Sequence, residues 1–359
     1  MIQTAGSFTR GSGRLTLMMC VMLFVGAARA QTLPVRPDMV TPGTEQAIEK
    51  GLAYLVRTQS RDGSWRTGTN YGSYPTTMTS LAGIALMAGG NTPVEGRYAM
   101  NVRRAVDFIL ASVNDSGLIS RMGEEGRSMY GHGFSMLFLA EAYGMEQDVS
   151  RQQRIRRVLE NAVALTGKAQ SRDGGWIYTP DSSGDEGSVT VTQIQGLRAI
   201  RNAGIKVPKE VVEKAVQYIE KSANTDGGIR YTARGQGGSL VPITAAAVAV
   251  LYNAGQYENP VAGRCLEFLK KQMVGAGGGN PNRISGGHKF YTMLYLAQGM
   301  YLSSEENWKS YFPTVRDDLI ATQSAEGSWE GDGVGPTYGT AIAMITLQLP
   351  YQYLPILQR

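Results

Sequence analysis

The chain has 359 residues, of which 42% are hydrophobic and 18% charged, and its formal net charge is +5. Three of the positive charges, Arg10, Arg14 and Arg29, lie in the first 30 residues, so the rest of the chain is close to neutral. This balance argues against a basic nucleic-acid-binding protein. Only one cysteine, Cys265, follows residue 30, and the whole chain has two histidines, which excludes a disulfide framework and a histidine-rich metal centre.

Residues 1–30 have the pattern of an export signal peptide. Two arginines precede an apolar run from Leu15 to Val25, and the small-x-small sequence Ala28-Arg29-Ala30 follows it. The run is shorter than the roughly 20 apolar residues that span a bilayer. We therefore expect cleavage after Ala30, a linker over residues 31–43, and a periplasmic or secreted mature chain without a transmembrane segment.

Residues 44–350 contain a six-fold internal repeat. The segments 59–65, 170–176 and 323–329 are near copies that read Gln-Ser-x-Asp/Glu-Gly-Ser/Gly-Trp, and weaker relatives lie between them. One glycine marks each of the six loops, at intervals of 50 to 57 residues: Gly63, Gly117, Gly174, Gly227, Gly277 and Gly327. The six units use nearly all of the mature chain, so we expect a single domain.

Each unit predicts two helices of different character. An amphipathic stretch precedes the glycine loop, as in residues 47–56 and 211–219. An alanine-rich, almost wholly apolar stretch follows it, as in residues 80–87, 244–251 and 340–347. Because the apolar helices must be buried on most sides, we predict an all-α fold, an α/α toroid of six helical hairpins. An open solenoid is the alternative, but it would need polar end repeats.

The C-terminal tail, residues 351–359, follows the sixth apolar stretch. Pro350 and Pro355 prevent its continuation as a helix, and its apolar residues need cover. We expect the tail to pack at the end of the ring opposite to the starts of the inner helices. A ligand would then enter only from the other end.

The repeat resembles that of squalene cyclases and prenyltransferase β subunits. Residues 50–65 resemble the Gln-Trp repeat of this superfamily, and residues 188–200 are similar to its inner-helix segments. The tail is similar to that of exported bacterial proteins with the same repeats. The resemblance covers about residues 44–350 and implies a terpenoid cyclase-type α/α toroid. It is far less specific for an activity.

The catalytic residues that the resemblance would imply are missing. Squalene-type cyclases carry an Asp-x-Asp-Asp acid, which does not occur here, and the acidic cluster Asp181 to Glu186 has a different spacing. Thr292 stands where the zinc-binding histidine of prenyltransferases would be, and Cys265 is expected to pack on an outer helix. We therefore assign no catalytic residue, no metal and no cofactor.

Candidate ligand-binding residues gather in the loops before the apolar helices, which should all start at one mouth of the ring. His132 and His288 are three units apart, and we expect them on opposite sides of this mouth, too far apart to share a metal. Tyrosines, which combine an apolar ring with a polar hydroxyl, recur in the same loops. The predicted funnel-mouth site consists of Tyr74, Tyr130, His132, His288, Tyr291 and Tyr338.

The same loops carry cations, and helix starts carry partial positive charge, so a site for an anion is a further expectation. The cations concerned are Arg121, Arg127, Arg230, Arg234 and Lys289. The three loop tryptophans, by contrast, are expected to be packed joints between units, because Asp-Gly is turn chemistry that recurs in several units.

Two classes of function stay open on the sequence. In the first, the chain is a non-catalytic binding or scaffold protein that uses the central funnel. In the second, it is an enzyme. The enzyme would be of the terpenoid cyclase or transferase type, or it would cleave a polysaccharide, by analogy with other α/α toroids. The missing catalytic residues favour binding. The expected partner is a hydrophobic small molecule, a glycan or a partner protein.

Overall fold

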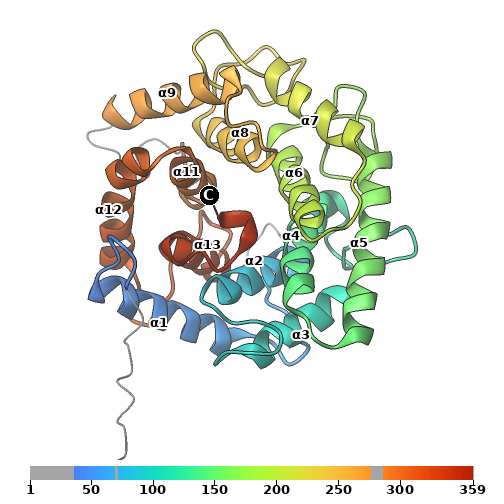
Figure 1. The fold of residues 1–359 in the computed structure, drawn as a ribbon, viewed down its shortest axis with the longest axis vertical. Coiled ribbons are helices and arrows are strands. Elements are labelled where there is room, and N and C mark those ends of the chain that lie inside the picture. Colours follow the sequence, from blue (N-terminus) through green and yellow to red (C-terminus); the bar gives the residue numbers. More distant parts are fainter. Residues whose placement is uncertain (1–35, 69–71, 276–285, 359) are drawn as a thin grey trace, which may run out of the picture. The chain divides into compact units, whose positions relative to one another are not determined.

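A computed structural model of the chain describes residues 36–68, 72–275 and 286–358. The predicted signal peptide and residues 31–35 of the predicted linker lie outside these ranges. Helical structure begins at Pro42, where the hydroxyl of Thr41 accepts a hydrogen bond from the backbone N–H of Thr44 and caps the first helix. Two concentric rings of helices follow (Figure 1).

The two rings contain the two kinds of helix that the sequence predicts. The outer ring consists of α1 (Pro42–Thr58), α3 (Ala99–Leu110), α5 (Val149–Ala169), α7 (Lys209–Lys221), α9 (Pro260–Gly275) and α12 (Glu305–Thr322). The inner ring consists of α2 (Pro75–Ala88), α4 (Ser128–Met145), α6 (Gly187–Asn202), α8 (Val241–Asn253), α11 (Lys289–Ser303) and α13 (Pro336–Gln348). Short 3₁₀ turns are η1 (Glu125–Arg127), η2 (Leu349–Tyr351) and η3 (Pro355–Leu357).

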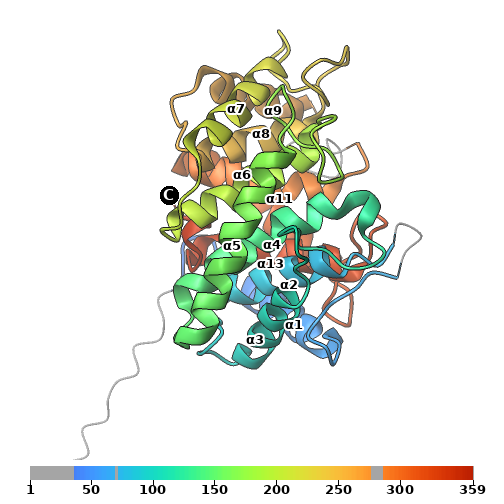
Figure 2. The ribbon, with the colours of Figure 1, turned by 90° about the vertical axis from the view of Figure 1, so that its right-hand side faces the viewer.

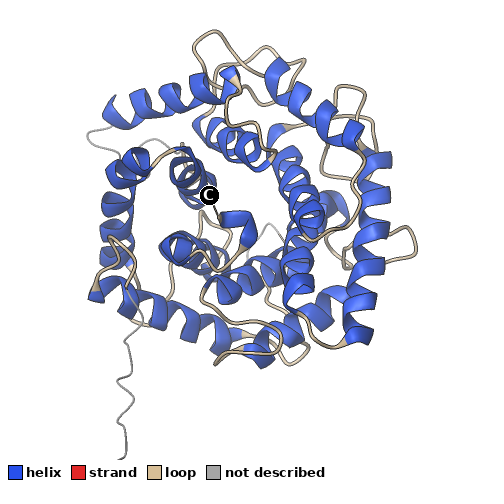
Figure 3. Ribbon diagram, viewed as in Figure 1, coloured by secondary structure: helices blue, strands red, loops and turns tan. Residues whose placement is uncertain are grey.

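The sequence pattern of each helix determines its layer. In α7 the buried residues Val211, Ala215, Tyr218 and Ile219 share one face, and the opposite face meets solvent. In α2 every residue is buried, as a helix enclosed on all sides requires. The structure has no strand within the described ranges (Figure 3), which confirms the predicted all-α class.

The inner ring is closed. Its helices contact one another in the order α2, α4, α6, α8, α11, α13, and α13 packs against α2 again. The last unit also meets the first in the outer ring, where α12 contacts α1. This closure excludes the open solenoid and confirms the α/α toroid.

The Gln-x-x-x-Gly-x-Trp loops join each unit to the next. In the last loop, the Gln323 amide donates hydrogen bonds to the Gly327 carbonyl at 3.0 Å and to the Ala47 carbonyl of α1 at 2.9 Å. Gly327 has φ 91°, and a Cβ there would lie 2.5 Å from the Lys50 carbonyl oxygen of α1. Only glycine fits this left-handed backbone and close approach.

The loop tryptophans are packed joints, as the sequence predicts. Trp65, Trp176 and Trp329 are almost completely buried. Each indole N–H donates a 2.8 Å hydrogen bond to a carbonyl near the end of the preceding outer helix, and the acceptors are Leu55, Thr166 and Leu319. The indole therefore satisfies a helix-end carbonyl while it fills the space between units.

The C-terminal tail closes one end of the inner ring. Leu354, Ile356 and Leu357 are buried, and η3 packs against α6. Figure 1 shows the C-terminus at the centre of the ring, and Figure 2 shows it at the end opposite to the long loops. The predicted packing of the tail is confirmed.

No helix in the described ranges is both long and apolar enough to cross a membrane.

Candidate functional site

Six tyrosines lie at or just below the mouth where the inner helices start. We call them the tyrosine cluster: Tyr130 of α4, Tyr178 in the loop before α6, Tyr231 in the loop before α8, Tyr291 and Tyr295 of α11, and Tyr338 of α13. All except Tyr295 keep part of their surface accessible to solvent. Tyr295 lies one helical turn below Tyr291 and is fully buried.

Direct contacts link these side chains. The rings of Tyr130 and Tyr178 are 5.9 Å apart between centroids, and those of Tyr291 and Tyr295 are 4.9 Å apart. The hydroxyls of Tyr178 and Tyr231 hydrogen-bond to each other. Burial raises the pKa of Tyr291 well above its usual value, and the nearby Tyr295, Tyr130 and Tyr338 raise it further. The tyrosines from five inner-helix regions therefore lie close together at the mouth.

Glu186 is the buried acid of this group. It is the N-cap of α6 and accepts hydrogen bonds from the backbone N–H groups of Ser188 and Val189 at 2.8 and 2.5 Å. Its Oε2 also accepts a hydrogen bond from the Ser188 hydroxyl at 2.6 Å, and that hydroxyl meets the phenol of Tyr130. Burial raises the pKa of Glu186, although these hydrogen bonds and one from Tyr231 oppose the shift.

Two phenols of the cluster have unused hydrogen-bonding capacity. The hydroxyl oxygens of Tyr291 and Tyr295 are buried and have no hydrogen-bond partner among the described residues. A buried polar group without a partner costs free energy, so such groups are uncommon in a native core.

The structure brings together half of the predicted site. Tyr130, Tyr291 and Tyr338 converge as the repeat spacing predicts. Tyr178 and Tyr231 belong to the recurring loop tyrosines that were expected around this mouth, but the predicted site did not include them. The prediction missed Tyr295, although it follows Tyr291 at the four-residue spacing that puts two residues on one helical face. It also missed Glu186 as a member of the site. The only signal for that residue was its place directly before an inner helix.

The prediction for His132 is wrong, because this residue is completely buried and faces the outer ring. Its Nδ1 accepts a hydrogen bond from the backbone N–H of Ile119, and its Nε2 pairs with the hydroxyl of Thr166 on α5, both at 3.1 Å. The helix α4 already begins at Ser128, so His132 lies about 200° around the helix from Tyr130. Burial lowers the pKa of His132 to about 4.

The two remaining predicted residues stay at the mouth. His288 is exposed and is the N-cap residue of α11, near the carboxylate of Asp332. Tyr74 is the N-cap residue of α2 and is partly buried, with its ring against Gly72. Both lie at helix starts, as predicted, and within the described part of the chain neither has a side-chain hydrogen bond or ring contact with the tyrosine cluster.

Two of the five cations expected to form a site for an anion are engaged in ion pairs, and the other three contact neutral groups. Arg121 donates to the Ser112 hydroxyl, Arg127 lies over the Tyr178 ring, Arg230 donates to the Ala233 carbonyl, Arg234 pairs with Asp173, and Lys289 pairs with Asp318.

Carboxylates also occupy three of the helix starts. Glu124 accepts from the Thr76 N–H of α2, Glu186 caps α6, and Asp332 accepts from the N–H groups of Phe290 and Tyr291 of α11. These acids offset the partial positive charge that the helix ends would otherwise present.

The interior below the mouth is filled. On α4, Ser135 contacts Ser80 of α2 and His132 contacts the outer ring, so the face with Phe134, Leu137 and Glu141 points inward. These three side chains are 5 to 7% exposed. The amide of Gln195 on α6 donates to Gln298 on α11 at 2.8 Å, although α8 lies between these helices in the ring. This hydrogen bond crosses the part of the interior in front of α8.

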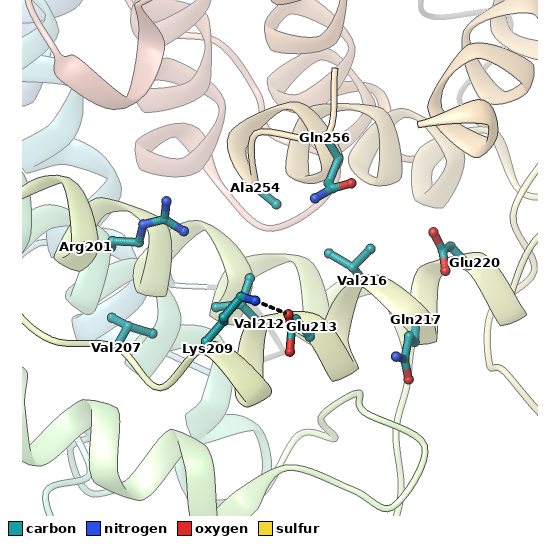
Figure 4. Close-up of a pocket in the computed structure, with 10 residues that line it drawn as sticks. All are labelled: Arg201, Val207, Lys209, Val212, Glu213, Val216, Gln217, Glu220, Ala254 and Gln256. Atoms are coloured by element: carbon teal, nitrogen blue, oxygen red, sulfur yellow. Dashed lines mark ion pairs between the residues drawn. The ribbon is translucent and has the colours of Figure 1, made fainter. Parts of the chain in front are cut away.

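A separate hollow lies on the outside of the ring, beside α7 and the ends of α6 and α8 (Figure 4). Its volume is about 600 Å³. Exposed charges of both signs line it, and Lys209 pairs with Glu213 at 2.9 Å.

Within the described ranges, no three histidine, cysteine, aspartate or glutamate side chains form a group that could hold a metal ion. Cys265 is buried in α9, and burial raises the pKa of its thiol to about 12.

Comparisons with known proteins identify the fold. No protein-family model and no curated protein sequence matches the chain. Among solved structures, it is similar to the type II terpene cyclase MstE from Scytonema, with 14% identity, a TM-score of 0.57, and coverage of 87% of this chain and 99% of that one.

Two carbohydrate-related proteins show the same likeness. A cellobiose 2-epimerase from Spirochaeta thermophila has 12% identity, a TM-score of 0.63, and coverage of 88% and 98% of the two chains. An inactive variant of an α-1,6-mannanase from Salegentibacter, solved with α-1,6-mannotriose, has 9% identity, a TM-score of 0.59, and coverage of 85% and 98%. At these identities the likeness establishes the α/α toroid fold alone.

Proposed function

We propose that this protein binds a ligand at the tyrosine cluster and does not transform it. The observation that supports this most is the pair of buried, unpartnered hydroxyls of Tyr291 and Tyr295 beneath partly exposed rings. A ligand that covers the rings and reaches these hydroxyls would gain apolar contact and satisfy polar groups that are otherwise unpaired. We also propose that the protein does this outside the cytoplasm, on the basis of residues 1–30.

The acids at the mouth support binding over catalysis. Glu124, Glu186 and Asp332 each accept backbone N–H groups at a helix start. A carboxylate with its oxygens engaged in this way stabilises the helix and has little freedom to exchange protons with a substrate. Their positions are therefore explained by the fold.

One observation favours a second candidate, an enzyme that uses Glu186 as a proton donor. Burial raises the pKa of Glu186, and a raised pKa keeps a carboxylic acid protonated closer to neutral pH. The similar structures also include a terpene cyclase, an epimerase and a mannanase.

The test is mass spectrometry of the small molecules that copurify with the protein from its native source. The account predicts a defined ligand with the parent chain, and loss of that ligand in a Tyr291→Phe Tyr295→Phe variant that folds normally. Equal ligand content in parent and variant would contradict the site. Tyr257→Ala, which changes an exposed tyrosine in the turn between α8 and α9, is the matched control.

The same preparations separate binding from catalysis. Incubated with the protein, the released ligand should be recovered unchanged. Chemical conversion that disappears in Glu186→Gln but persists in Glu124→Gln would replace the binding proposal with the enzyme.

A further inference from the structure

We infer that the ligand of the tyrosine cluster is a neutral carbohydrate chain. This inference rests on the proposed binding function and adds the chemical class of the ligand. Three properties of the mouth carry it: the filled interior, the capping carboxylates, and the arrangement of rings and hydroxyls.

The filled interior excludes a long hydrocarbon chain as the ligand. Binding of such a chain depends on removing its apolar surface from water. Below the mouth, however, Leu137 and Phe134 are nearly buried and the Gln195–Gln298 hydrogen bond crosses the interior. The tail with Ile356 closes the opposite end. A ligand therefore lies on the mouth and keeps part of its surface in water, which suits a hydrophilic molecule.

The carboxylates at the mouth disfavour an anion. A diphosphate or carboxylated ligand needs unpaired cations or open helix starts. Here Lys289 is paired with Asp318 at 2.7 Å, and Arg127 lies over the Tyr178 ring. Glu186 and Asp332 occupy the starts of α6 and α11. A negatively charged ligand at these two helix starts would meet carboxyl groups in place of free backbone N–H groups.

The tyrosines themselves match a sugar chain. A pyranose has an apolar C–H face that packs on an aromatic ring and hydroxyls at its edge that exchange hydrogen bonds. The rings of Tyr130, Tyr178 and Tyr338 are partly accessible, and the hydroxyls of Tyr291 and Tyr295 lack partners. Because the accessible rings come from several units of the toroid, one ligand can touch more than one ring. This spread favours an oligosaccharide over a monosaccharide.

The experiment is isothermal titration of the mature chain with neutral xylo-, manno-, cello- and malto-oligosaccharides of three to six residues and with the corresponding monosaccharides. Oligogalacturonate, geranylgeraniol and geranylgeranyl diphosphate are titrated in parallel. We expect at least one neutral series to bind, with affinity at least tenfold higher for the hexamer than for its monosaccharide. Tyr178→Ala and Tyr291→Phe should each weaken this binding at least fivefold, and Tyr257→Ala should leave it unchanged.

The other outcomes refute the inference in distinguishable ways. If only geranylgeranyl diphosphate, geranylgeraniol or oligogalacturonate binds, and Tyr178→Ala abolishes that binding, the inference of a neutral carbohydrate ligand is wrong. The tyrosine cluster then remains a binding site. Binding of an oligosaccharide that is unchanged in both cluster variants would overturn the site. No binding of any neutral oligosaccharide overturns the inference, and the copurification experiment then decides the proposed function separately.

Discussion

Replacement of Trp329 by alanine tests the joint that closes the ring. The Trp329 indole is 2% exposed, packs between the last unit and the first, and donates to the Leu319 carbonyl at 2.8 Å. Loss of a large buried aromatic side chain costs about 3–5 kcal/mol. The Leu319 carbonyl also loses its partner, which costs about 1–3 kcal/mol more. We expect the free energy of unfolding to fall by at least about 4 kcal/mol.

The assay is equilibrium urea unfolding followed by circular dichroism. Trp329→Phe keeps most of the apolar contact and removes only the donor, so its loss should be smaller, about 1–3 kcal/mol. Tyr257→Ala changes an exposed ring and should cost less than about 1 kcal/mol. A decrease in the free energy of unfolding of less than about 1 kcal/mol for Trp329→Ala would refute the packed joint. The indole would then be a candidate for stacking against a ligand.

Three further predictions concern titration and processing. Burial lowers the pKa of His132 to about 4, so the folded state resists protonation of this residue. His132 should therefore contribute up to about 3 kcal/mol of stability, and this contribution is lost as the pH falls from about 6.5 to 4. The variant His132→Gln should not show this loss. Because burial raises the pKa of Glu141 to about 7, its contribution should be lost as the pH rises from about 4.5 to 7, and Glu141→Gln should remove that loss. The two residues make stability depend on pH in opposite ways. The urea midpoints of the two single variants should therefore change with pH in opposite directions between about pH 4.5 and 6.5. Urea midpoints that change with pH in the same direction would contradict the roles given to His132 and Glu141. Mass spectrometry of the exported protein should find Gln31 at the N-terminus, and a chain retained whole in the cytosol would contradict the predicted signal peptide.

The fold could be predicted because its determinants are local and repeated. The Gln323 to Trp329 loop contains its own turn glycine, its helix-end donor and its buried ring, and the same residue types recur in other units. Residues 80–87 are apolar on all sides, which by itself requires an inner layer. A closed ring then follows from six units without polar ends.

The site could be predicted only in part because its details depend on contacts between distant segments. Acids from distant parts of the chain cap the helix starts that suggested a site for an anion. Glu124 caps the start of α2 at Thr76, 48 residues away in the sequence, and Asp332 caps the start of α11 at Phe290, 42 residues away. Sequence periodicity does not reveal such pairs. The prediction for His132 failed for a local reason, because the helix α4 begins four residues before this histidine, which rotates its side chain away from the mouth.

The most direct test of the tyrosine cluster is a crystal structure of the protein purified from its native source. The account predicts ligand density at the mouth, against the rings of Tyr130, Tyr178 and Tyr291, with a polar atom of the ligand within hydrogen-bond distance of the Tyr291 hydroxyl. Ligand density confined to the outer hollow beside α7, or a mouth occupied only by ordered water in protein shown by mass spectrometry to carry its ligand, would contradict it.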